Sequence, residues 1–136
     1  MRVSPYLGFN GNCVEAINFY EKAFGAKAEY CQYKDTPPSE GYQPAPGTED
    51  FVMHGTMKIG DEMIMLADTS PDYPTSFSNG LSICVELENA ERVRAVFEGL
   101  KEGGKVIMEP QECFWNKCFC HLEDKFGATW LLMIIE

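Results

Sequence analysis

The chain has 136 residues, of which 45% are hydrophobic, and a formal net charge of −10 at pH 7. This length suits one domain, or two closely packed halves of one, and the acidity argues against nucleic-acid binding, which needs clustered lysines and arginines. No apolar run approaches the roughly 20 residues that span a bilayer, and the N-terminus has no signal-peptide pattern, so we expect a soluble cytoplasmic protein without a membrane partner.

The first half begins with a predicted strand over residues 3–9, followed by an amphipathic helix. Asn12 is the expected N-cap of that helix, because its side chain can accept a backbone N–H. Gly25 stands where the helix needs a left-handed residue to end. A second strand is expected over residues 26–34.

Residues 35–50 form a predicted loop rich in proline, glycine and acidic residues. A loop of this length in a compact domain is expected to be functional or mobile, and it could close over a ligand. Two further strands, over residues 51–59 and 62–67, are predicted to make a hairpin around Gly60 and Asp61. An irregular segment, residues 68–80, then separates the two halves.

The second half repeats this order of elements. A strand over residues 81–87 leads into a helix capped by Asn89 and ended by Gly103, and three more strands are expected over residues 105–109, 117–123 and 129–135. We interpret the chain as two copies of one supersecondary unit, about residues 1–68 and 81–136. Each copy reads strand, helix and three strands, so the fold class is α+β.

Four phrases carry a resemblance to a known family: SPYLGFNGNCVEAINFYEKAFGA (residues 4–26), KIGDEMIMLAD (58–68), GGKVIMEPQECFW (103–115) and DKFGATW (124–130). Together they resemble the vicinal oxygen chelate superfamily, the glyoxalase and bleomycin-resistance group, and its PhnB-like branch in particular. The resemblance implies two βαβββ modules with curved mixed sheets that form a cup, usually in a homodimer.

In the glyoxalase members of this family, four side chains in the cup bind a divalent metal. Matching the local phrases places these positions on Pro5, Met65, Ser82 and Leu131. None of the four side chains supplies the carboxylate oxygen or imidazole nitrogen that such ions prefer. The departure from the family pattern predicts that the chain has no metal and no other cofactor in the cup.

The same four positions become candidates for contact with a small molecule. Tyr6 and Phe9 on the first strand are further candidates for the wall of the cup. Phe114 and Trp115 lie between two predicted strands, where an aromatic pair either closes a pocket over a planar ligand or packs on the partner of a dimer.

Candidates for chemistry are few. His54 lies within a predicted strand, where it is either a general base or an ordinary hydrogen-bonded or exposed histidine. Cys118 and Cys120 share one face of a strand and His121 lies on the other, so reduced thiols are a better interpretation than a soft-metal site. The turn at residues 10–12 has one glycine, unlike the glycine-rich turn of common methyl-donor folds.

Two main functions remain open from the sequence, besides a metal-independent enzyme that would use His54 as its base. The first is a metal-free dimeric protein that binds a small apolar or aromatic molecule in the cup. The alternative is a metal-dependent enzyme resembling glyoxalases or dioxygenases, which would act as a lyase or isomerase and would need a divalent ion.

Overall fold

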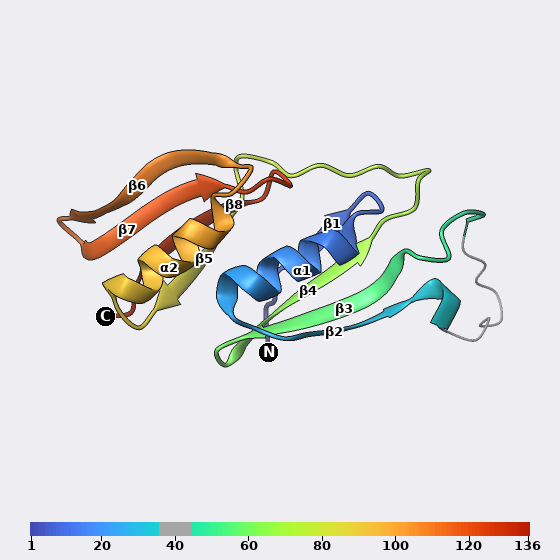
Figure 1. Ribbon diagram of the computed structural model, residues 1–136, viewed down its shortest axis with the longest axis horizontal. Helices are drawn as coiled ribbons and strands as arrows, with labels where there is room; N and C mark the ends of the chain where they lie inside the picture. Colours follow the sequence, from blue (N-terminus) through green and yellow to red (C-terminus); the bar gives the residue numbers. More distant parts are fainter. Residues whose placement is uncertain (36–44) are drawn as a thin grey trace. The chain divides into compact units, whose positions relative to one another are not determined.

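The computed structural model describes residues 1–35 and 45–136, which group into two compact units, residues 1–21 with 25–76 and residues 22–24 with 77–136. Each half of the chain forms one α-helix and four strands, and Figure 1 labels these elements along the chain. The elements in order are β1 (Tyr6–Phe9), α1 (Cys13–Phe24), β2 (Ala28–Gln32), a 3₁₀ turn (Tyr33–Asp35), β3 (Val52–Ile59), β4 (Glu62–Asp68), β5 (Ser82–Leu87), α2 (Ala90–Leu100), β6 (Lys105–Cys113), β7 (Asn116–Glu123) and β8 (Thr129–Ile134).

The first unit is a four-stranded mixed sheet in the order β1-β4-β3-β2, with α1 against one face (Figure 1). β1 runs parallel to β4, and the other neighbours are antiparallel. The core lies between sheet and helix, where Phe9 of β1 packs on Tyr20 of α1 with ring centroids 6.5 Å apart. Burying such large apolar side chains contributes about 1.5–3 kcal/mol each and so holds the helix on the sheet.

The second unit repeats this topology in the order β5-β8-β7-β6, with β5 parallel to β8. α2 contributes its apolar stripe to the core, and β7 and β8 contribute alternate residues. Trp130 and Leu132 of β8 are fully buried there, together with Cys120 and Leu122 of β7. The expected α+β class with two βαβββ modules is therefore confirmed.

Of the four asparagine and glycine predictions at the helix ends, two are confirmed and two are wrong, one of them Gly103, because α2 already ends at Leu100. Gly25 ends α1 with φ 66°, and the Asn89 side chain accepts the Arg92 N–H at 2.8 Å at the start of α2. The Asn12 side chain makes no capping hydrogen bond to α1. Asp68, at the end of β4, accepts the N–H of Cys13 instead, so the cap comes from a residue distant in sequence.

Some strand bounds also differ from the sequence prediction. β1 begins at Tyr6 rather than residue 3, and β6 continues to Cys113 rather than ending at residue 109. β6 is an edge strand with register shifts, which explains how it accommodates Pro110. Most of the predicted 35–50 loop, and with it the question of closure over a ligand, lies outside the described residues.

Within residues 1–35 and 45–136, no helix is long and apolar enough to cross a membrane. All six cysteines are free thiols, and Cys13, Cys118 and Cys120 are buried. Burial raises the pKa of both Cys13 and Cys120 to about 12, with smaller contributions from the charges of Asp68 and Cys118 respectively. These two thiols therefore stay protonated at neutral pH.

Candidate functional site

The first sheet has one face against α1 and one face without a helix. Gly55 faces α1, because a Cβ added there would lie 3.5 Å from the Cδ1 of Ile17. Side chains alternate along a strand, so the neighbouring residue Thr56 lies on the helix-free face. Thr56 pairs with Met65, and Met65 pairs with Tyr6. We call this the first helix-free face.

A hydrogen bond joins two side chains on this face. The hydroxyl of Tyr6 lies 2.9 Å from Nδ1 of His54, and the ring centroids are 5.7 Å apart. Tyr6 is on β1 and His54 on β3, so the phenol ring reaches over β4, where the next residue after Met65 on this face is the small Ala67. Partial burial raises the pKa of Tyr6, with a further contribution from Cys13.

The second sheet also has a helix-free face, crossed by an equivalent row of residues. Leu131 of β8 pairs with Cys84 of β5 and with His121 of β7, and His121 pairs with Met108 of β6. Directly paired residues share a face, and Leu131 alternates with Trp130 and Leu132 in the core. We call this the second helix-free face, and its middle is apolar and half-exposed.

His121 has an unusual position on that face. Its Nε2 atom is buried and has no hydrogen-bond partner among the residues that the structure describes. Buried polar atoms are normally paired, so this atom marks a local energetic cost. His121 lies, as predicted, on the face opposite Cys118 and Cys120. Within the described ranges there is no group of three or more His, Cys, Asp or Glu side chains arranged to hold a metal.

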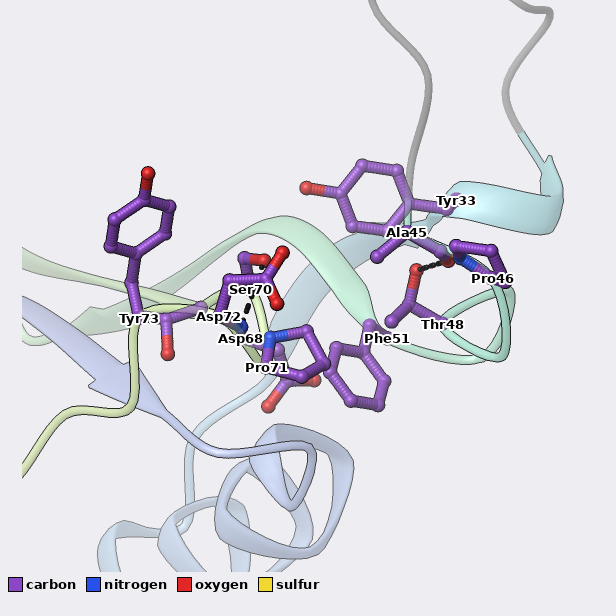
Figure 2. A pocket seen from close by; sticks show the side chains of 11 residues that line it. Tyr33, Ala45, Pro46, Thr48, Phe51, Asp68, Ser70, Pro71, Asp72 and Tyr73 are labelled. Atoms are coloured by element: carbon purple, nitrogen blue, oxygen red, sulfur yellow. Dashed lines mark hydrogen bonds between the residues drawn. The ribbon is translucent and has the colours of Figure 1, made fainter.

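The first unit also contains a pocket of about 520 Å³, which is separate from the first helix-free face (Figure 2). Its lining comes from two loop segments and the strand ends beside them: Tyr33, Ala45, Pro46, Thr48, Phe51, Asp68, Thr69, Ser70, Pro71, Asp72 and Tyr73. The carboxylate of Asp68 is already engaged, because it accepts three backbone N–H groups. None of the ligand-contacting residues predicted from the sequence lines this pocket.

Pro5 and Met65, the first two of the four positions matched to the family's metal ligands, lie next to each other in the structure. Met65 is half-exposed on the first helix-free face, and its N–H donates to the Pro5 carbonyl at 2.9 Å. The repeat register pairs Tyr6 with Met65 and Cys84 with Leu131, so Ser82 corresponds to Ser4 rather than to Pro5. Ser4 is also a poor metal ligand, so neither Ser4 nor Pro5 supplies a metal-binding side chain at this position.

The remaining candidates have different environments. Ser82 and Leu131 share the second helix-free face, since Ser82 is two residues from Cys84. Phe9 is only 2% exposed and packs on Tyr20, so its side chain belongs to the core. Phe114 is fully exposed in the turn between β6 and β7.

Trp115 makes a specific aromatic contact on the second unit. Its ring meets that of Phe119 edge-to-face with centroids 4.5 Å apart, and 42% of the residue is exposed. Sequence reasoning placed His121 opposite the thiols but missed Phe119 as part of this face. The signal was the alternation along residues 116–123, because every second residue there faces away from α2.

The residues present do not fit the divalent metal of glyoxalase members. Proline and leucine have no donor atom, a methionine thioether is soft, and a serine hydroxyl is a weak neutral ligand. None of the four residues itself carries a carboxylate or an imidazole, and the single histidine beside Leu131, His121, is not a set of metal ligands.

Comparisons with known proteins agree with this fold. The model of the Glyoxalase/Bleomycin resistance protein/Dioxygenase superfamily matches residues 4–132. Protein YjdN of Escherichia coli is 31% identical over all of this chain and 97% of its own length.

Two solved structures are also similar. Protein PA1353 from Pseudomonas aeruginosa has a TM-score of 0.84 and 30% identity, covering 98% of this chain and 97% of its own. A Bacillus cereus PhnB protein, named as a putative 3-demethylubiquinone-9 3-methyltransferase, has a TM-score of 0.77 and 27% identity, covering 99% of this chain and 100% of its own. This chain thus belongs to the Glyoxalase/Bleomycin resistance protein/Dioxygenase superfamily and has a PhnB protein among its relatives.

Proposed function

We propose that this protein is a metal-free binder of a small apolar or aromatic molecule, and that it works as a cytoplasmic homodimer. The observation that carries the proposal is the chemistry at the family's metal positions. Met65 and Leu131 present a thioether and an isobutyl group, half-exposed, in the middle of the two helix-free faces. Half-exposed apolar side chains gain free energy when a ligand removes them from water, at about 25 cal/mol per Å².

The helix-free faces support this proposal better than the pocket does. The pocket is lined mainly by loop residues, and its one buried carboxylate is occupied by backbone N–H groups. The faces instead lie on strands, whose backbone pairing fixes the positions of the side chains that a ligand would meet.

The homodimer and the compartment belong to the same proposal. Phe114 and Trp115 expose aromatic surface at one end of the second unit, as a dimer contact or a ligand wall would require. Free thiols at all six cysteines suit a reducing cytoplasm. Light scattering on the purified protein measures its mass in solution, and a monomer at micromolar concentration would contradict the dimer.

A ligand panel tests the binding function. Thermal shift and tryptophan fluorescence with small aromatic and aliphatic molecules should reveal stabilisation, because a ligand that binds only the folded state raises the melting temperature. Met65→Gln should weaken binding through loss of apolar contact, whereas Tyr73→Ala in the pocket should not. Loss of binding only in Tyr73→Ala would move the site to the pocket, and a panel without any stabilisation would reject the proposal.

The methyltransferase name of the Bacillus cereus relative is not carried over to this chain. A methyl-donor fold needs a glycine-rich turn with free N–H groups facing the cofactor. The single glycine of the equivalent turn, Gly11, donates its N–H to Asp68 at 2.8 Å. The ring of Phe51 also covers it, since a Cβ at Gly11 would lie 2.9 Å from that ring.

A metal-dependent enzyme is the competing function, and elemental analysis separates it from ours. Protein purified without chelators should contain substoichiometric divalent metal. One equivalent of metal whose loss follows substitution of Ser82 or Met65 would overturn the metal-free binder and favour the enzyme.

A further inference from the structure

Tyr6 and His54 form a hydrogen bond between their side chains on the first helix-free face. Among the residues that the structure describes, the other histidine, His121, has no partner at its buried Nε2. Tyr6 and His54 are both exposed, and the Tyr6 side chain keeps about half of its surface accessible to solvent. Tyr6 pairs directly with Met65, the residue at the centre of the face. The edge of a molecule that lies on Met65 would therefore contact the Tyr6–His54 pair.

The chemistry of the pair follows from its two tautomers. If the Tyr6 hydroxyl donates to Nδ1 of His54, then Nε2–H is a donor and the phenol oxygen keeps a lone pair. If Nδ1–H donates to the phenol oxygen, then the phenol O–H is the donor and Nε2 the acceptor. In either arrangement the pair offers one donor and one acceptor outward.

A hydroxyl group matches this arrangement, because it donates one hydrogen bond and accepts others. A carboxylate only accepts, and it would also meet Glu29, which lies in the same row of the face, on a protein with a net charge of −10. The apolar surface of Met65 next to the pair suits an aromatic ring, since a thioether makes favourable contacts with such rings.

We propose that Tyr6 and His54 anchor the hydroxyl of a phenol-type ligand whose ring lies on Met65. The inference rests on the proposed function and adds the class of ligand to it. Partial burial raises the pKa of Tyr6, so its phenol is protonated at neutral pH and the shared proton is present in both tautomers. The pair binds and orients the ligand, and no covalent step is assigned to it.

The experiment compares p-cresol with toluene, which has the same ring and methyl group without the hydroxyl. Isothermal titration of the full chain should give about tenfold tighter binding of p-cresol, because a net hydrogen bond is worth about 1.4 kcal/mol. Tyr6→Phe should reduce this ratio to less than about threefold. Tyr30 is also an exposed tyrosine, but it lies on the α1 side of the sheet. Tyr30→Phe should therefore keep the ratio of the two affinities.

Nitrogen NMR of the histidine rings gives a readout that a merely structural role would not change. The chain has two histidines, so His54→Gln assigns both ring systems. Tyr6→Phe and p-cresol should each shift the ring nitrogens of His54 and leave those of His121 in place. Melting temperatures check that the variants remain folded.

The outcomes separate the inference from the proposed function. Equal affinities for p-cresol and toluene, with unmoved His54 nitrogens, would overturn the anchor while leaving a binder of apolar molecules intact. Failure of both probes would also overturn the anchor, and the wider panel would then decide the proposed function by itself.

Discussion

The carboxylate of Asp68 accepts the backbone N–H of Cys13 at 3.0 Å and thereby ties the end of β4 to the start of α1. The same side chain accepts the N–H of Gly11 at 2.8 Å and, through its other oxygen, that of Val52 at 2.9 Å. One buried acid therefore fixes the beginning of a helix and of a strand. An anionic group near a helix N-terminus is also favoured by the helix dipole.

Asp68→Asn should lower the free energy of unfolding by about 2 kcal/mol, because the new amide group would face the Val52 N–H and leave that buried donor unpaired. Urea unfolding measures the change. Asp72→Asn is the matched control, since the Asp72 side chain is exposed and makes no comparable contact with the residues that the structure describes, and it should change the stability by less than about 0.5 kcal/mol. Equal effects of the two substitutions would contradict the role of Asp68.

Two glycines make a second matched pair. A Cβ at Gly104 would clash with the backbone oxygen of Glu123, whereas no non-neighbouring atom of residues 1–35 or 45–136 lies within 4 Å of a Cβ at Gly60, whose φ is +63°. Gly60→Ala should cost about 1 kcal/mol from the left-handed backbone alone. Gly104→Ala should cost more than about 3 kcal/mol, because strand β7 must move. A larger loss of unfolding free energy in Gly60→Ala than in Gly104→Ala, measured by urea unfolding, would contradict the expected clash at Gly104.

His121 provides a substitution that is expected to stabilise the ligand-free protein. Its Nε2 is buried and has no partner within the described part of the chain. His121→Leu removes that atom and should raise the free energy of unfolding by about 1 kcal/mol. A loss of stability of this size in thermal unfolding would mean that the imidazole makes a compensating interaction in solution, for example with water.

The buried thiols predict how stability depends on alkaline pH. The pKa of Cys13 and of Cys120 is about 12 in the folded chain against an ordinary 9.0, so above 9.0 the unfolded state binds fewer protons than the folded state. Stability from these groups is complete below pH 9.0 and decreases as the pH rises towards 12. Urea unfolding of the wild type and of Cys13→Ala/Cys120→Ala should show a shallower alkaline decrease in the variant. Identical slopes would contradict the raised pKa values.

The repeated unit could be predicted from the sequence because both copies carry local signals. Helical periodicity, Gly25 and Asn89 act on their own neighbours, and each is found where expected. The cap of α1 could not be predicted in this way. Asp68 is 55 residues from Cys13, and only folding of the parallel β1–β4 pair brings them together.

The candidate site shows the same division between local and distant signals. Alternation along a strand places Leu131 and Met65 opposite the helices, but which strands are neighbours is not a local property. The Tyr6–His54 hydrogen bond therefore has no sequence signature, since it crosses β4 between β1 and β3. Phe9 looked like a ligand contact for a related reason, because the sequence does not tell which face of β1 meets α1.

The most direct test of the account uses carbon NMR of the methionine methyl groups, of which the chain has seven. Met65 reports on the first helix-free face, and the fully buried Met57 is the internal control. We predict that a bound aromatic molecule from the panel shifts the Met65 methyl signal and leaves Met57 unchanged, while equimolar Mn²⁺ does not broaden Met65. Selective broadening of Met65 by equimolar Mn²⁺, with no response to any aromatic molecule, would contradict the account.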